Sequence, residues 1–195
     1  SPGVFEYTRE GRLVRSLPLP VAYLGLRPNL GFEALSASPD GSRLFAGAES
    51  SLRQDGTPAT AEAGALTRLL VLDPSGRNRP REYAYRTEPV PRLSPDRPSK
   101  GDNGVPEILA LGRDDLLVME RAYVEEQGAG PRSANVIRLF HVRLDAKAEV
   151  TGRWSLKTAP PVATLRKTLV LDLATLSAHL PPRLVNLENF EAMSF

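Results

Sequence analysis

Short apolar runs separated by turn sequences are the main pattern of the chain, and they predict β-strands. Residues 34–37, 44–48 and 66–73 form three such runs in the first half. The turns between and after them, Ser38-Pro39-Asp40-Gly41 and Asp73-Pro74-Ser75-Gly76, carry Pro, Asp and Gly where tight turns require them. Runs of this length bounded by turn residues indicate short antiparallel strands.

The same layout returns in the second half of the chain. Strands are predicted at 108–111 and 116–119, on either side of the turn 112–115. A polar loop follows the second strand in both halves, at 51–65 and at 122–135, and a third strand then ends on Leu-Asp, at 66–73 and at 136–145. The two halves therefore read as two copies of one structural unit.

Three glutamates mark equivalent positions in this repeat. Glu33 follows Asn29-Leu30-Gly31-Phe32, Glu107 follows Asn103-Gly104-Val105-Pro106, and Glu191 lies in Leu187 to Phe195, which starts a third copy. They are 74 residues (33 to 107) and 84 residues (107 to 191) apart. A recurring period of this kind indicates a repeat architecture.

The remaining segments complete or connect the units. Residues 4–17 predict two strands around the turn 8–11, like the back half of a unit, and 21–26, between prolines, predict a short extended run. Residues 81–86 and 149–156, the latter with Trp154, predict the outer strands of the two units, and the proline-rich stretch 87–103 predicts a loop. Residues 164–180 are ambiguous: 169–173 fit a strand, and 174–180 fit a helical turn ended by Pro181-Pro182.

These elements predict an all-β fold, and specifically a partial β-propeller with about two full four-stranded antiparallel blades and flanking part-blades. We expect one domain over 1–195, incomplete at both ends. Residues 1–28 would end a preceding blade, 29–100 and 101–185 would each form a blade, and 186–195 would start the next. Such a piece alone should fold poorly or aggregate. A β-sandwich is the alternative, although it gives no reason for the glutamates to recur in register.

Composition excludes several functions and adds little else. The net charge of +2 is too small to predict a nucleic-acid partner, and the basic residues are scattered. The absence of cysteine excludes disulfides, thiolate metal sites and a cysteine nucleophile. No apolar run approaches the roughly 20 residues of a membrane-spanning helix. The 18 prolines and 15 glycines suit a turn-rich β protein.

The predicted topology places one group of acidic residues at the end of the propeller that carries the long loops, here called the rim. Glu33, Glu107 and Glu191 would begin first strands there, and Glu49 and Glu120 would end second strands. Converging carboxylates repel unless a cation intervenes, and a hard divalent ion, with Ca²⁺ the expected one, takes carboxylate and Asn oxygens. Glu33, Glu107 and Glu191 are therefore the candidate metal ligands, with Asn103 or Asn189 as added donors. The alternative is a structural latch, in which each glutamate accepts backbone N–H groups of the neighbouring blade.

A second group would contact substrate. Arg121, Glu49, Glu120 and Asn103 are the candidate substrate-binding residues, because an arginine suits an anionic group such as a phosphate. Arg53 and Lys100, in rim loops, could assist, whereas Arg121 could instead pair with Glu120 or Glu107. His141 and His179 are interpreted as structural. No G-x-S-x-G, H-E-x-x-H, Walker or EF-hand motif is present, which disfavours an ordinary serine hydrolase.

Three segments carry a family resemblance: N-L-G-F-E-A-L-S-A-S-P-D-G-S-R-L-F-A-G-A-E-S, G-D-N-G-V-P-E-I-L-A-L with L-L-V-M-E-R-A-Y, and N-L-E-N-F-E-A-M-S. In this order they resemble the phytase-like family, described as "esterase-like activity of phytase". The resemblance implies a secreted or periplasmic bacterial β-propeller that hydrolyses phosphate or carboxylate esters of small molecules, with divalent-metal assistance as in calcium-dependent propeller phytases. It transfers no catalytic residue.

Two functions follow as hypotheses. The first is an ester hydrolase in which a rim-bound cation activates water and Arg121 steadies the anion. The second is a non-catalytic propeller that uses the rim to bind a ligand or protein partner, its glutamates serving as latches. Turnover of ester substrates with and without a chelator would separate them.

Overall fold

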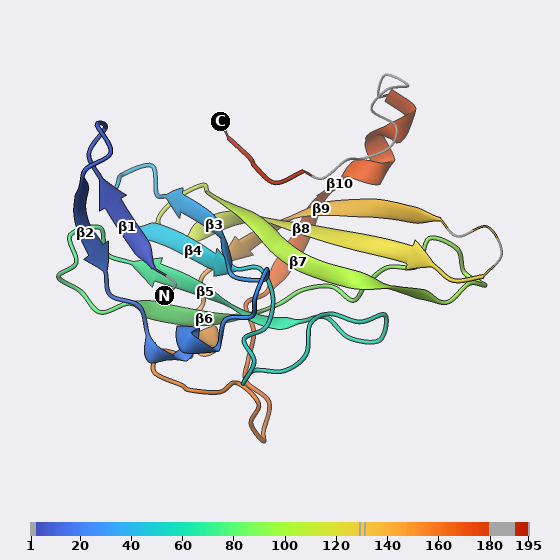
Figure 1. The fold of residues 1–195 in the computed structure, drawn as a ribbon, viewed down its shortest axis with the longest axis horizontal. Coiled ribbons are helices and arrows are strands. Elements are labelled where there is room, and N and C mark those ends of the chain that lie inside the picture. Colours follow the sequence, from blue (N-terminus) through green and yellow to red (C-terminus); the bar gives the residue numbers. More distant parts are fainter. Residues whose placement is uncertain (1–2, 129, 131, 180–189, 195) are drawn as a thin grey trace.

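The computed structural model describes residues 3–128, 130, 132–179 and 190–194, and within them the regular structure is β-strand with three short 3₁₀ helices. The strands form one two-stranded and two four-stranded antiparallel sheets (Figure 1). The all-β prediction is therefore confirmed. None of the helices in the described part of the chain is long and apolar enough to cross a membrane.

The first two sheets come from the N-terminal half. β1 (Val4–Tyr7) pairs with β2 (Leu13–Leu17), as the sequence predicts for 4–17. The second sheet has the order β3-β4-β5-β6. Its strands are β3 (Phe32–Ala37), β4 (Leu44–Ala48), β5 (Leu66–Leu72) and β6 (Arg81–Arg86). All four lie where the sequence places them.

The third sheet has the order β7-β8-β9-β10, and its first two strands are much longer than expected. They are β7 (Ser99–Ala110), β8 (Asp115–Glu126), β9 (Ser133–Arg143) and β10 (Lys167–Asp172). A 3₁₀ helix, Leu173–His179, follows β10. The strand and helical-turn interpretation of residues 164–180 is therefore confirmed, although Leu180 lies outside the described residues.

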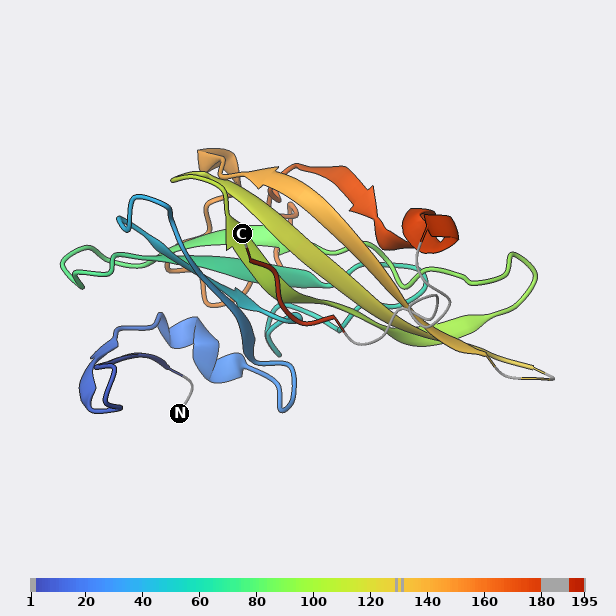
Figure 2. The ribbon, with the colours of Figure 1, turned by 90° about the horizontal axis from the view of Figure 1, so that it is seen from above.

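The three sheets stack face to face as layers (Figure 2). Phe45, Leu69 and Tyr85 of the second sheet pack against Ile108 and Phe140 of the third. The other face of the second sheet packs against β1, β2 and the 3₁₀ helix Val21–Gly25. All seven residues of β5 are consequently buried. Sheets stacked this way occur in propellers and in sandwiches alike, so the propeller remains a prediction.

Four of the predicted segments are wrong. Within the predicted loops 87–103 and 122–135, residues 99–103 belong to β7, residues 122–126 to β8 and residues 133–135 to β9. Ala122 and Val124 find apolar partners there in a small core formed with loop residues such as Ala59 and Val90. Residues 21–26 form a 3₁₀ turn rather than an extended run, because Ala22 and Tyr23 turn into the core beside β4.

The predicted outer strand 149–156 is the fourth error, since β10 takes that place. Residues 146–165 instead run along the open edge of β6. Val150 N–H donates to Glu82 O at 2.8 Å, and Leu165 N–H donates to Ala84 O at 2.8 Å. This covers an edge that would otherwise expose unpaired backbone groups.

Arg68 of β5 fastens this segment to the second sheet. Its side chain is fully buried and bonds to both Asp55 carboxylate oxygens, at 2.7 and 2.9 Å, and to Glu82 Oε1 at 2.9 Å. The guanidinium also donates to the carbonyl oxygens of Arg153 and Trp154. One cation thus joins two buried carboxylates to the segment that covers β6.

Candidate functional site

Strand alternation sorts the predicted site residues onto two faces of the third sheet. In the β7–β8 pairing, Gly104 lies opposite Arg121 and Asn103 lies opposite Ala122. Successive side chains on a strand point to opposite faces, and residues paired across strands share a face. Arg121 therefore shares a face with Gly104, whereas Glu120 and Asn103 share the other.

The Arg121 face meets the end of β4, where Glu49 lies. Glu49 is anchored by its backbone, because its N–H donates to Gly31 O at 2.8 Å and its carbonyl accepts from Val105 N–H at 2.9 Å. Its Oε1 lies 3.7 Å from Arg121 Nη2, and the two side chains are only 13% and 15% exposed. Arg121 also contacts Glu191, with Nη1 to Oε1 at 3.0 Å.

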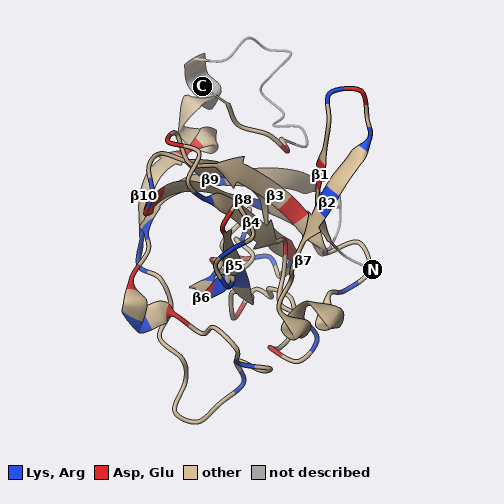
Figure 3. Ribbon diagram, turned by 90° about the vertical axis from the view of Figure 1, so that its left-hand side faces the viewer, with Lys and Arg blue, Asp and Glu red and all other residues tan. Residues whose placement is uncertain are grey.

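Glu49 has an unusual electrostatic environment. Burial raises the pKa of its carboxyl most, and the negative charges of Glu33, Asp102 and Glu191 raise it further, against the opposing effect of Arg121. The result is a pKa of about 7, compared with 4.5 for an ordinary glutamate. Glu33 belongs to β3, which contacts β7 (Figure 3). At neutral pH this carboxyl can both accept and release a proton.

The opposite face of the sheet holds a buried polar cluster around Glu120. Glu120, 2% exposed, accepts hydrogen bonds from Tyr85 Oη at 2.6 Å and Lys167 Nζ at 2.5 Å through Oε1. Its Oε2 accepts from Glu88 N–H at 2.8 Å and Asn103 Nδ2 at 3.0 Å. With four donors on one carboxylate, Glu120 joins the second sheet to the third and has no free lone pair directed at a ligand.

The three predicted metal ligands are placed differently from one another. Glu33 is exposed, Glu191 pairs with Arg121, and Glu107 accepts the N–H groups of Ile108 and Met193. Burial raises the pKa of Glu107. The bond from Met193 is the kind of contact that the latch alternative predicts at this position.

These contacts do not fit a calcium site. Among the described residues, no group of three or more His, Asp or Glu side chains is arranged to hold a metal ion. Arg121 already supplies the positive charge that a cation would bring to Glu49 and Glu191. The roles proposed below therefore involve no metal, and Ca²⁺ remains a prediction from the sequence.

Other predicted residues lie apart from Glu49 and Arg121. Arg53 is exposed in the 51–65 loop, Lys100 pairs with Glu125 near the far end of β7, and His141 contacts Asp115 at 3.1 Å. Asn189 lies outside the described residues. His179 ends the last 3₁₀ helix.

Sequence reasoning missed two residues that shape the site, Asp102 and Gly104. Asp102 adds negative charge near Glu49, and burial raises its own pKa. A Cβ at position 104 would lie 2.7 Å from Glu49 Cγ, so only glycine leaves room for this side chain. The Asp-Asn-Gly sequence reads as a turn, and only its pairing with β8 reveals these roles.

Comparison with known proteins gives one match. The family model "Phytase-like: Esterase-like activity of phytase" matches residues 1–195, the whole chain. No curated protein and no solved structure matches. The chain belongs to the phytase-like family described by esterase-like activity.

Proposed function

We propose that the protein is an esterase-like hydrolase in which Glu49 acts as general base and Arg121 stabilises negative charge on the ester. Glu49 takes a proton from a water molecule as the water oxygen attacks the ester carbon or phosphorus. Arg121 faces the oxygen on which charge develops. Glu49 then returns its proton to the departing alcohol, which leaves an acid and an alcohol as products.

The observation that carries this proposal is the Glu49–Arg121 pair. A general base works best when its pKa lies near the operating pH, and the pKa of Glu49 is raised to about 7. The guanidinium is held at the same place, 3.7 Å away, by its contact with Glu191. Perturbed carboxyls beside a fixed cation are frequent at catalytic sites.

The family description supports the reaction class and leaves the substrate open. Both phosphate and carboxylate esters remain within the proposal, because both pass through a transition state with added negative charge on oxygen. Metal assistance is not needed for the roles given to Glu49 and Arg121.

Turnover of three substrates tests the proposal: p-nitrophenyl acetate, p-nitrophenyl phosphate and phytate, each assayed with the full-length protein in Ca²⁺ or EDTA. We expect hydrolysis of at least one ester that EDTA does not abolish. Activity that requires Ca²⁺ would contradict the metal-free roles of Glu49 and Arg121. Inactivity on all three would contradict the hydrolase and favour a non-catalytic binding module.

The binding-module alternative has one observation in its favour. The carboxylates of Glu107 and Glu120 accept hydrogen bonds from backbone or side-chain donors that join neighbouring elements. Glu107 is the one of the three repeated glutamates used in this way, as the latch hypothesis expects, and Glu120 joins the second sheet to the third. Glu49 differs from them, because its carboxylate is left beside Arg121.

Gly104→Ala provides a steric test of the site. The added methyl would crowd Glu49 Cγ at 2.7 Å and its carbonyl oxygen at 3.1 Å, so the carboxylate must shift from Arg121. We expect roughly a hundredfold loss of kcat, because small displacements of a catalytic group are costly. Gly112→Ala is the matched control, since its Cβ meets nothing within 4 Å. Equal activity of the two variants would show that the position of Glu49 is irrelevant.

A further inference from the structure

The face of the third sheet that carries Arg121 continues outward along β7, β8 and β9. In the pairing, Asp102 lies opposite Tyr123 and Lys100 lies opposite Glu125. β9 adds Asn135 opposite Tyr123 and Ser133 opposite Glu125. Residues paired across strands share a face, and every second residue along a strand lies on that face again. Asp102, Tyr123 and Asn135 therefore lie on the same face as Arg121. Lys100, Glu125 and Ser133 lie there as well.

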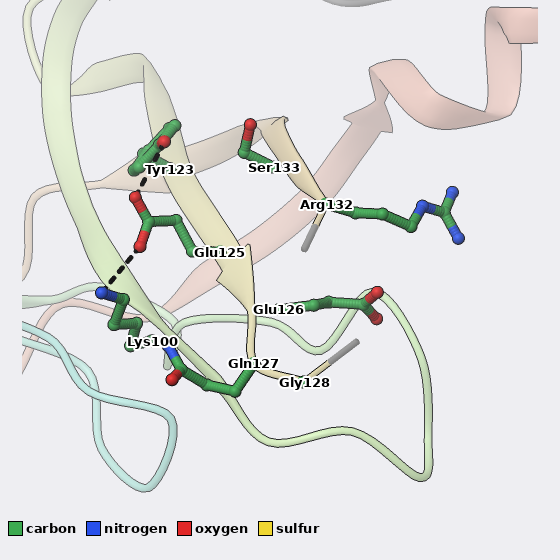
Figure 4. Close-up of a pocket in the computed structure, with 8 residues that line it drawn as sticks. All are labelled: Lys100, Tyr123, Glu125, Glu126, Gln127, Gly128, Arg132 and Ser133. Atoms are coloured by element: carbon green, nitrogen blue, oxygen red, sulfur yellow. Dashed lines mark hydrogen bonds and ion pairs between the residues drawn. The ribbon is translucent and has the colours of Figure 1, made fainter. Parts of the chain in front are cut away.

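A cavity of about 500 Å³ lies at the far end of this face. Its walls come from the ends of the three strands (Figure 4). The lining residues are Lys100, Tyr123, Glu125, Glu126, Gln127, Gly128, Arg132 and Ser133. From Arg121 to Glu125 the strand advances roughly 13 Å, so one elongated ligand can contact both the cavity and the Glu49–Arg121 pair.

The charges of Lys100 and Glu125 at the cavity cancel each other. Lys100 Nζ lies 2.9 Å from Glu125 Oε2, and Tyr123 Oη donates to Glu125 Oε1 at 3.1 Å. Figure 4 shows these three side chains linked through the Glu125 carboxylate. The side chains of Glu126 and Arg132 extend to the other side. A highly charged anion would find no excess of positive charge here.

The cavity instead offers a ring and several hydrogen-bonding groups. Tyr123 lies in the middle of β8 and is 46% exposed. Its ring provides an apolar platform, while Ser133, Gln127 and the Lys100–Glu125 pair supply donors and acceptors around it. An aromatic face bordered by polar groups suits a flat molecule with C–H groups on its faces and hydroxyl groups at its edges.

We propose that this cavity is a distal subsite for the saccharide part of an ester substrate, with Tyr123 stacking on a sugar ring. The inference rests on the proposed function: the ester lies at Glu49 and Arg121, and the neutral, hydroxyl-rich group extends along β8. Binding energy from this remote part of the substrate positions the ester for attack. The preferred substrate class is therefore an acylated oligosaccharide, not a multiply phosphorylated one.

Tyr123→Ala tests the subsite. With partially acetylated xylo-oligosaccharides, we expect KM to rise at least tenfold, whereas kcat/KM for p-nitrophenyl acetate, which cannot reach the cavity, stays unchanged. Tyr123→Phe keeps the ring and should keep KM within about threefold. Tyr7→Ala is the control, because Tyr7 is an exposed tyrosine of the first sheet, away from the cavity. It should change the kinetic constants for neither substrate.

Binding measured without turnover separates this inference from the proposed function. Titration of the full-length protein with deacetylated xylo-oligosaccharide by calorimetry should show binding that Tyr123→Ala weakens at least tenfold, even if no ester is hydrolysed. The saccharide subsite would be wrong if no binding were seen and if the protein preferred phytate equally with and without Tyr123→Ala. Hydrolysis of p-nitrophenyl acetate would still support the hydrolase in that case.

Discussion

Replacing Glu49 with glutamine is expected to lower kcat/KM for ester hydrolysis by about 10² to 10⁴, the usual contribution of a general base. Glutamine keeps the size of the side chain but cannot take a proton. The wild-type kcat/KM should fall about tenfold per pH unit below pH 7, because the pKa of Glu49 is raised to about 7. Residual activity of the variant should lack this acid limb.

Glu33→Gln is the matched control for this substitution. Glu33 is exposed, and its negative charge helps to raise the pKa of Glu49. Removing that charge should move the acid limb to lower pH and leave the maximal rate unchanged. If Glu49→Gln retained full activity, or if Glu33→Gln lost as much activity, the role of Glu49 as base would be wrong.

Stability measurements distinguish catalysis from misfolding in the same variant. The folded state binds the proton of Glu49 more tightly than the unfolded chain does, because its pKa is raised from 4.5 to about 7. The stability that comes from this proton is complete below about pH 4.5 and is lost as the pH rises to about 7. Glutamine never ionises and therefore removes this decline. Glu49→Gln should be at least as stable as the wild type at pH 8, measured by urea unfolding.

The largest effect on stability is expected for Arg68→Met. Methionine is similar in length but leaves the carboxylates of Asp55 and Glu82 buried without their cation. Breaking a buried ion pair in this way costs about 3–5 kcal/mol of unfolding free energy. The segment 146–165 should also detach from β6, which hydrogen exchange at Val150 and Leu165 would report.

Arg81→Met is the control, because Arg81 and Glu149 form an ion pair whose side chains are 44% and 28% exposed. Such a pair contributes about 0–1 kcal/mol. Urea unfolding of both variants measures the difference. Equal stabilities would show that the Arg68 cluster does not fasten the covering segment.

Short sequence patterns correctly predicted the tight turns and the strands that flank them. The turns at 38–41 and 73–76 and the strands on either side of them follow from Pro, Asp and Gly placement, and they are found as expected. The long β7–β8–β9 extension was missed because Lys100, Tyr123 and Glu125 resemble loop residues when their pairing is unknown. Residues 149–156 resemble a strand, but β10 is the segment that pairs with β9.

The sequence predicted which residues lie near the site, but it did not predict which face of the sheet each side chain is on. Glu49 and Arg121 were both expected on the rim, and the structure brings them to 3.7 Å. Glu120 was expected beside Arg121, yet neighbouring residues of one strand face opposite ways, and Glu120 points to Tyr85 and Lys167. Asp102 and Gly104 acquire their roles only through contact with Glu49, which the sequence does not reveal.

The titration of Glu49 tests the central claim most directly. Carboxyl ¹³C chemical shifts of the glutamates, followed by NMR from pH 3 to pH 9 with Glu49→Gln used for assignment, would give its pKa in the folded protein. A midpoint near pH 7 is the predicted result. A midpoint near the ordinary value of 4.5 would contradict the account, because Glu49 would then be a solvated carboxylate without the environment of a general base.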